Sequence, residues 1–149
     1  MIVSELMTKK VITAQAEEKV DRVLYLFHYD NIRHLPIVSE KGKLVGMLSD
    51  RDIKKILGPR KTQHESKDGT VLTVSARKIR TVMRRQPYTI GPNERAADAA
   101  ALMVKRKVGA LPVISKDKLV GIITATDILK AFVKLCDIVE PFSKAVKGK

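Results

Sequence analysis

The sequence has no tryptophan and only six phenylalanine and tyrosine residues, so aromatic residues make up 4% of its 149 positions. We therefore expect a core of Val, Ile, Leu, Ala and Met. No apolar run approaches the roughly 18–20 residues that cross a bilayer. Residues 1–5 show no basic stretch leading into an apolar one, so we expect no signal peptide. One cysteine, Cys136, cannot form an internal disulfide. These absences predict a cytoplasmic protein that does not contact a membrane.

Catalytic motifs are also missing from the sequence. It contains no G-x-S-x-G nucleophile turn, no GxxxxGK[S/T] phosphate loop and no GxGxxG dinucleotide motif. The three histidines (His28, His34 and His64) are not spaced with Cys136 or with paired acids as metal ligands are. We expect a protein that is not an enzyme, binds no metal and requires no cofactor.

Acidic residues are scarce relative to basic ones, and the formal net charge is +13. The excess is densest in residues 58–85, which carry eight Lys and Arg against two acids. Such a field attracts phosphate-bearing partners, either small nucleotides or a nucleic acid backbone. The alternative is a solvated basic surface that keeps the protein soluble.

What the sequence does contain is an internal duplication. The run KLVG at 43–46 returns at 118–121, and LPIVS at 35–39 aligns with LPVIS at 111–115. Met7 and Thr13 align with Met83 and Thr89 at an offset of 76. We therefore predict repeat 1 at 1–57, a basic linker at 58–75, and repeat 2 at 76–149 with a C-terminal helix.

Each copy follows the same order of predicted elements. A short strand at 11–13 or 88–90 is followed by an amphipathic helix, two strands and a final helix beginning near Ser49 or Thr124. The linker includes one further candidate strand at 70–74. This predicts an α/β (α+β) fold of two βαββα repeats. One repeat alone would expose too much apolar sheet, so we expect a pseudo-two-fold pair with ligand clefts at the junction.

The sharpest motif is Gly-φ-φ-Ser/Thr-x-x-Asp, where φ is apolar, at 46–52 and again at 121–127. Ser or Thr followed three residues later by an acid is typical of a capping box at a helix start. The same helix start offers free amides and positive potential to a phosphate. A carboxylate beside it can accept two hydrogen bonds from a ribose diol. Both roles are compatible.

Arg33 and His34 stand directly before Leu35-Pro36. Arg33 is suited to a bidentate phosphate contact, and His34 would make binding pH-dependent. The alternative is that both point to solvent. Repeat 2 has Gly109-Ala110 here, so we expect two unequal sites, with repeat 1 the better equipped.

Taken in order, these motifs resemble a tandem cystathionine-β-synthase-type (CBS) domain pair, often called a Bateman module, here free-standing. The resemblance rests on residues 7–13, 31–38 and 46–52, and on 82–89, 109–114 and 121–127. It implies adenosyl ligands such as AMP, ADP, ATP, S-adenosylmethionine or NAD, and a homodimer of modules. The set is also loosely similar to the acetoin-utilisation regulators.

By the same resemblance, Asp52 and Asp127 would hold ribose hydroxyls, and Ser49 and Thr124 would contact phosphate or ribose. Thr13 and Thr89 would line the sites from the first strand, and Arg33 and His34 would bind phosphate. Apolar walls and backbone contacts for adenine would come from Leu35, Pro36 and Ile37 and from Leu111, Pro112 and Val113.

Three functions follow as hypotheses. The first is a sensor of adenine nucleotides or related adenosyl compounds that regulates a partner protein of unknown identity. The second is nucleic acid binding through a basic cluster just before the second repeat's strands (Arg77, Lys78, Arg80, Arg84 and Arg85), although only Tyr88 is near it for base stacking. The third is a structural dimer with empty clefts.

Overall fold

The computed structural model describes residues 1–58 and 74–147, with side chains up to 142. The chain divides into two compact units. Unit 1 comprises Met1–Lys10, Thr89–Ser115 and Val120–Lys149, and unit 2 comprises Val11–Tyr88 and Lys116–Leu119. The repeats of the sequence and the compact units of the structure are therefore different sets of residues. Most of the predicted linker lies outside the described residues, as do positions 70–73 of its candidate strand.

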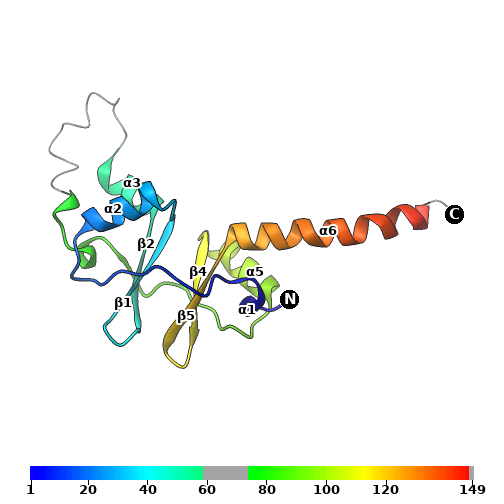
Figure 1. Cartoon of the computed structure of the whole chain (residues 1–149), viewed down its shortest axis with the longest axis horizontal. Helices are drawn as coiled ribbons and strands as arrows, with labels where there is room; N and C mark the ends of the chain where they lie inside the picture. Colours follow the sequence, from blue (N-terminus) through cyan, green and yellow to red (C-terminus); the bar gives the residue numbers. More distant parts are fainter. Residues whose placement is uncertain (59–73, 148–149) are drawn as a thin grey trace. The chain divides into compact units, whose positions relative to one another are not determined.

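Figure 1 shows pairs of consecutive strands, β1-β2 and β4-β5, with helices before and after each pair. The described elements are α1 (Val3–Leu6), α2 (Val20–Tyr29), β1 (His34–Val38), β2 (Leu44–Ser49), α3 (Asp50–Leu57), the 3₁₀ turn η1 (Ile79–Thr81), β3 (Arg84–Arg85), α5 (Ala96–Arg106), β4 (Ala110–Ser115), β5 (Lys118–Thr124) and α6 (Ala125–Lys147). The strands form one sheet in the order β1-β2-β3 and another in the order β4-β5. The predicted α/β class with small sheets and helices is confirmed.

The first predicted strand of each repeat is not a strand but a single bridge, and this corrects the sequence-based expectation. Ala14 pairs in parallel with Ile37, and Ile90 with Val113. The amide of Ala14 donates to the carbonyl of Pro36 and its carbonyl accepts from Val38. The next step of such a ladder needs an N–H from residue 36. Proline has none, so the ladder stops after one residue.

Each unit has its own apolar core. In unit 2 the buried side chains come from α2, β1, β2 and α3, with Leu35, Ile37 and Leu48 fully buried. In unit 1 the equivalent core holds Leu111 and Val113 of β4, Ile123 of β5 and residues of α1 and α5. The cores contain no aromatic residue among their buried members, as the composition predicts. These cores hold the end of β2 next to the start of α3 in unit 2, and the end of β5 next to the start of α6 in unit 1.

The short helical segment at the start of each repeat packs in the unit that holds the strands of the other repeat. The amide of Val3 donates to Glu94 at 2.9 Å, and the amide of Ile79, at the matching position 76 residues on, donates to Glu18 at 2.8 Å. The bridge Thr8–Ile122 likewise matches the pairing of Arg84 with Met47. The duplication is thus reciprocal: each repeat supplies an edge segment to the other repeat's strands.

This crossing explains the glycine of the repeated motif. A Cβ on Gly46 would lie 2.6 Å from the sulfur of Met83 and 3.1 Å from the carbonyl oxygen of Arg84. At Gly121 the same atom would collide with the sulfur of Met7 and lie 3.1 Å from the carbonyl oxygen of Thr8. Glycine is required here because a methionine from the edge segment crosses the strand at van der Waals contact.

Candidate functional site

The predicted Ser/Thr-x-x-Asp element of repeat 1 forms a capping box at the start of α3. The amide and the hydroxyl of Ser49 both donate to Oδ2 of Asp52 at 2.9 Å, and the amide of Asp52 donates to Ser49 Oγ at 3.1 Å. One carboxylate oxygen of Asp52 is therefore committed to the cap. Oδ1 remains for another donor.

Repeat 2 builds the same network at the start of α6. The amide and hydroxyl of Thr124 donate to Oδ2 of Asp127 at 2.8 and 2.7 Å, and the amide of Asp127 donates to Thr124 Oγ1 at 3.3 Å. These bonds hold the carboxylate in one orientation, with Oδ1 directed away from the cap. The cap and the candidate ligand site are the same group of atoms.

The two carboxylates differ in what reaches Oδ1. Arg84 of β3 places Nη2 3.2 Å from Oδ1 of Asp52, and the Asp52 side chain is 16% exposed. The residue that matches Arg84 in the other repeat is Thr8, which has no charge. Among residues 1–58 and 74–142, no hydrogen bond or ion pair is recorded for Oδ1 of Asp127. Within these residues Oδ1 of Asp127 has no such contact, whereas Oδ1 of Asp52 is held by an ion pair.

His34 is brought to the Ser49–Asp52 site by strand register. It is the first residue of β1 and lies opposite Ser49, the last residue of β2. Burial lowers the pKa of His34 below its usual 6.5, against the carboxylates of Asp50 and Asp52, which favour the protonated form. The imidazole is thus biased toward its neutral state, in which it offers one donor and one acceptor.

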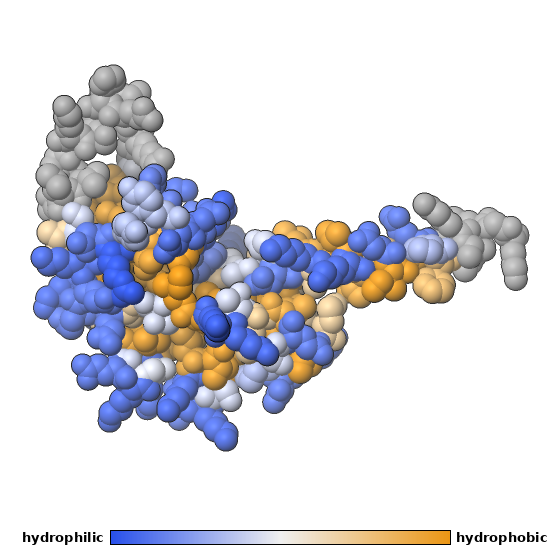
Figure 2. Space-filling view, viewed as in Figure 1, coloured by the Kyte–Doolittle hydropathy of each residue, from blue (hydrophilic) through white to orange (hydrophobic). Residues whose placement is uncertain are grey.

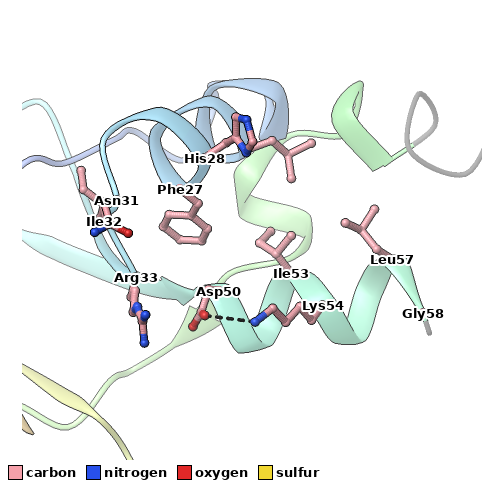
Figure 3. Close-up of a pocket in the computed structure, with 11 residues that line it drawn as sticks. Phe27, His28, Asn31, Ile32, Arg33, Asp50, Ile53, Lys54, Leu57 and Gly58 are labelled. Carbon is pink, nitrogen blue, oxygen red and sulfur yellow. Dashed lines mark hydrogen bonds and ion pairs between the residues drawn. The ribbon is translucent and has the colours of Figure 1, made fainter. Parts of the chain in front are cut away.

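Arg33 occupies a different place from the capped carboxylate. It lines a hollow of about 350 Å³ between α2 and α3 in unit 2, of which Asp52 is not a lining residue. Figure 3 shows Arg33 and Asp50 at one end of this hollow and Leu57 and Gly58 at the other. The backbone carbonyl of Arg33 accepts from the amide of Asp50 at 3.0 Å, while its side chain is exposed. Arg33 and Asp50 therefore share this hollow, and Asp52 does not line it.

The residues proposed as adenine walls are core residues of the two units. Leu35, Ile37, Leu111 and Val113 are 0% exposed and belong to the two cores. Pro36 and Pro112 are also fully buried, and their carbonyls accept from Ala14 and Ile90. Thr13 and Thr89 each precede the bridge residue by one position, along the outer edge of β1 and β4. Their part in ligand binding stays a prediction.

The basic cluster before repeat 2 is largely paired with acids of unit 2. Lys78 and Arg80 both contact Glu17, at 2.6 and 3.1 Å, and Arg84 contacts Asp52. The hydrogen bond from Lys78 holds the pKa of Glu17 below its ordinary value, with smaller contributions from the charges of Lys78 and Arg80. Sequence reasoning placed Arg84 in the basic cluster and did not predict its contact with Asp52. Arg84 stands 32 positions from Asp52, and no local spacing indicates their contact.

Two further properties bear on the class of site. In the described part of the chain, no three His, Cys, Asp or Glu side chains are grouped so as to hold a metal ion. Within the same residues, no helix has both the length and the apolarity needed to span a membrane.

The repeated capping network, the reciprocal edge segments and the duplicated sheets define a tandem α/β module of the ligand-binding type. The CBS domain family matches residues 3–58 and 79–134. The chain belongs to the CBS domain family and carries two copies of the domain.

Relatives of known sequence agree with this assignment. A CBS domain-containing protein of Dictyostelium discoideum is 29% identical over 144 residues, which cover 96% of this chain and 99% of that protein. The protein MJ1225 of Methanocaldococcus jannaschii is 31% identical over 132 residues, 88% of this chain. The chain spans 47% of MJ1225, and only 23% of a homoserine O-acetyltransferase of Methanococcoides burtonii.

Solved structures share the fold over most of the chain. The CBS domain pair of the protein MJ0100, in complex with 5′-methylthioadenosine and S-adenosyl-L-methionine, is 29% identical with a TM-score of 0.74, covering 90% of this chain and 97% of that one. A putative acetoin utilization protein from Vibrio cholerae is 28% identical with a TM-score of 0.76, covering 95% and 96%.

Proposed function

We propose that this chain is a regulatory module that binds an adenosyl compound and modulates a partner protein. The ribose diol of the ligand is held by the carboxylate of Asp127. The observation that carries the proposal is the fixed orientation of this carboxylate: its cap commits Oδ2 and leaves Oδ1 to accept hydrogen bonds. Two adjacent hydroxyls complement such a carboxylate because each can donate to it.

Support also comes from the related CBS domain pair of MJ0100, whose complex contains two adenosyl compounds. Neither of those two compounds bears a phosphate. Repeat 2 of this chain has Gly109-Ala110 where repeat 1 has Arg33-His34, so its site has no cation at those positions. An adenosyl compound recognised through its ribose and base therefore suits the Asp127 site better than a nucleotide triphosphate does.

Repeat 1 contributes a second, occluded site. Its Asp52 carries the same cap, but Arg84 occupies the remaining oxygen. A ribose would have to displace the guanidinium from Oδ1. We therefore propose one open site and one blocked site in each chain. The Arg33-His34 pair alone predicts the better site in repeat 1, whereas we propose the open site in repeat 2.

Isothermal titration calorimetry against 5′-methylthioadenosine, S-adenosylmethionine, AMP, ADP and ATP tests the proposal. Asp127→Asn keeps one acceptor oxygen for the cap but removes the charge offered to the diol. We expect it to weaken binding about 10- to 100-fold, since charge-assisted hydrogen bonds contribute roughly 1.5–3 kcal/mol.

The matched control is Asp52→Asn, which makes the same chemical change in the blocked repeat. It should leave the affinity of the open site within about twofold, because the proposed site at Asp127 does not include Asp52. Absence of heat with every compound, or equal loss of affinity in both variants, would overturn the proposal.

A further inference from the structure

Three arginines of unit 2 lie within electrostatic reach of the capping box of repeat 1. Arg84 contacts Oδ1 of Asp52 at 3.2 Å. The charges of Arg33 and Arg51 reach His34, whose place in β1 is opposite the first residue of this cap. Figure 2 shows hydrophilic side chains gathered over α2 and α3 of this unit. The surroundings of this capping box are therefore polar and rich in guanidinium groups.

The charges around this cap do not cancel. Arg84 balances Asp52, and Lys54 lies 3.4 Å from the carboxylate of Asp50. Arg33 and Arg51 are exposed, and within residues 1–58 and 74–142 no ion pair is recorded for either. Two guanidinium groups are therefore left over, and their net positive charge favours an anionic ligand at repeat 1.

None of the three arginines has a charged counterpart in repeat 2. The aligned positions hold Gly109, Thr126 and Thr8. At these positions a phosphate near Asp127 would find no cation and would face the negative charge of that carboxylate. The same capping box is therefore combined with cations in repeat 1 and with uncharged residues in repeat 2.

We propose that the two repeats discriminate between adenosyl compounds by the charge of the ligand, and that Arg84 sets the selectivity of repeat 1. This inference rests on the proposed function. The phosphate of an incoming ligand draws the guanidinium of Arg84 away from Asp52, and the freed Oδ1 accepts the ribose hydroxyls. A ligand without a phosphate offers Arg84 no replacement, so the site stays blocked. Repeat 1 takes adenosine phosphates, and repeat 2 takes phosphate-free adenosyl compounds.

The exchange of partners favours the phosphate. The side chain of Arg84 is 50% exposed, and ion pairs of exposed groups contribute little to stability. Only its Nη2 donates to Oδ1 of Asp52, so its other N–H groups can meet a phosphate before this contact breaks. A phosphate monoester carries roughly 1.5–2 negative charges at pH 7 and binds arginine through two parallel hydrogen bonds. The carboxylate offers a single charge and one contact.

Calorimetry on the Asp127→Asn chain isolates the site of repeat 1, and AMP and 5′-methylthioadenosine are the two probes. AMP should bind at one per chain, at least about tenfold more tightly than 5′-methylthioadenosine, as expected for charge-assisted hydrogen bonds to the phosphate. Adding Arg84→Thr, the residue that repeat 2 has at this position, should bring the two affinities within about threefold of each other. Arg84→Lys keeps the charge and should retain part of the preference.

Arg85→Thr in the Asp127→Asn chain is the matched control. It makes the same change at the next position of β3, where the side chain is exposed and no ion pair is recorded within the described residues. The preference for AMP should remain.

Three results would overturn the inference: no binding of AMP to the Asp127→Asn chain, equal affinities for the two probes in that chain, or a preference for AMP that survives Arg84→Thr. The proposed function fails separately. It stands if the unmutated chain binds 5′-methylthioadenosine and Asp127→Asn loses that binding, whatever Arg84 does. Absence of binding of both probes to every chain would overturn both.

Discussion

Arg84 and Asp52 form an ion pair of 3.2 Å between a side chain of β3 and the capping carboxylate of α3. The pair joins the edge segment at the start of repeat 2 to the capping motif of repeat 1. In the other repeat, Thr8 occupies the position of Arg84 and leaves Asp127 without this contact. A single position therefore gives the two capping carboxylates different surroundings.

Replacing Arg84 with threonine should convert the blocked site into an open one. On the proposed function, Arg84→Thr raises the calorimetric stoichiometry of the adenosyl ligand from one to two per chain. Stability should change by less than about 1 kcal/mol, because partly exposed ion pairs contribute little. The Arg84→Thr, Asp52→Asn double variant should return to one ligand. A stoichiometry of one in Arg84→Thr itself would show that the ion pair does not block the site.

Removal of either capping hydroxyl should destabilise the fold. Ser49→Ala and Thr124→Ala each delete the acceptor for the amide of the capping aspartate, at 3.1 and 3.3 Å. N-cap substitutions of this kind cost roughly 0.5–2 kcal/mol. Chemical denaturation measures the loss. Ser39→Ala is a useful comparison, because its hydroxyl accepts in a turn rather than at a helix start, and a loss as large as that of the cap variants would contradict this account.

Gly46→Ala should be destabilising because its methyl group meets Met83. The added Cβ would lie 2.6 Å from the sulfur of Met83 and 3.1 Å from the carbonyl oxygen of Arg84, so the Met83 side chain must shift and the Arg84 backbone must give by a few tenths of an ångström. Overpacking of this kind costs about 1–3 kcal/mol. In a double-mutant cycle, Met83→Ala should recover part of the loss, since it removes the colliding sulfur. Strictly additive effects would place the strain elsewhere.

Stability should fall as the medium is acidified through the ordinary pKa of histidine. The folded chain lowers the pKa of His34 below 6.5 through burial. Between that value and the lower folded one, the unfolded chain binds more protons, so unfolding becomes easier as pH falls. His34→Gln should flatten the dependence of Tm on pH between about 7.5 and 5.5. His28→Gln, which leaves His34 in place, should retain the slope, and an unchanged slope in His34→Gln would refute the assignment.

The sequence by itself determined the duplication, the class of fold and the position of both capping boxes. Those features are local in the sequence. They are periodic apolar residues, a proline in the strand that follows the first amphipathic helix of each repeat, and Ser or Thr three residues before an acid. Pro36, which lacks an N–H, also limits the first predicted strand to a single bridge. This effect became evident only once the structure showed which residues pair.

Only the tertiary structure decided which capped carboxylate is open. Arg84 reaches Asp52, and Met83 crosses Gly46, because the segment before each repeat pairs with the strands of the other. Such contacts depend on which strand edges meet and not on spacing along the chain.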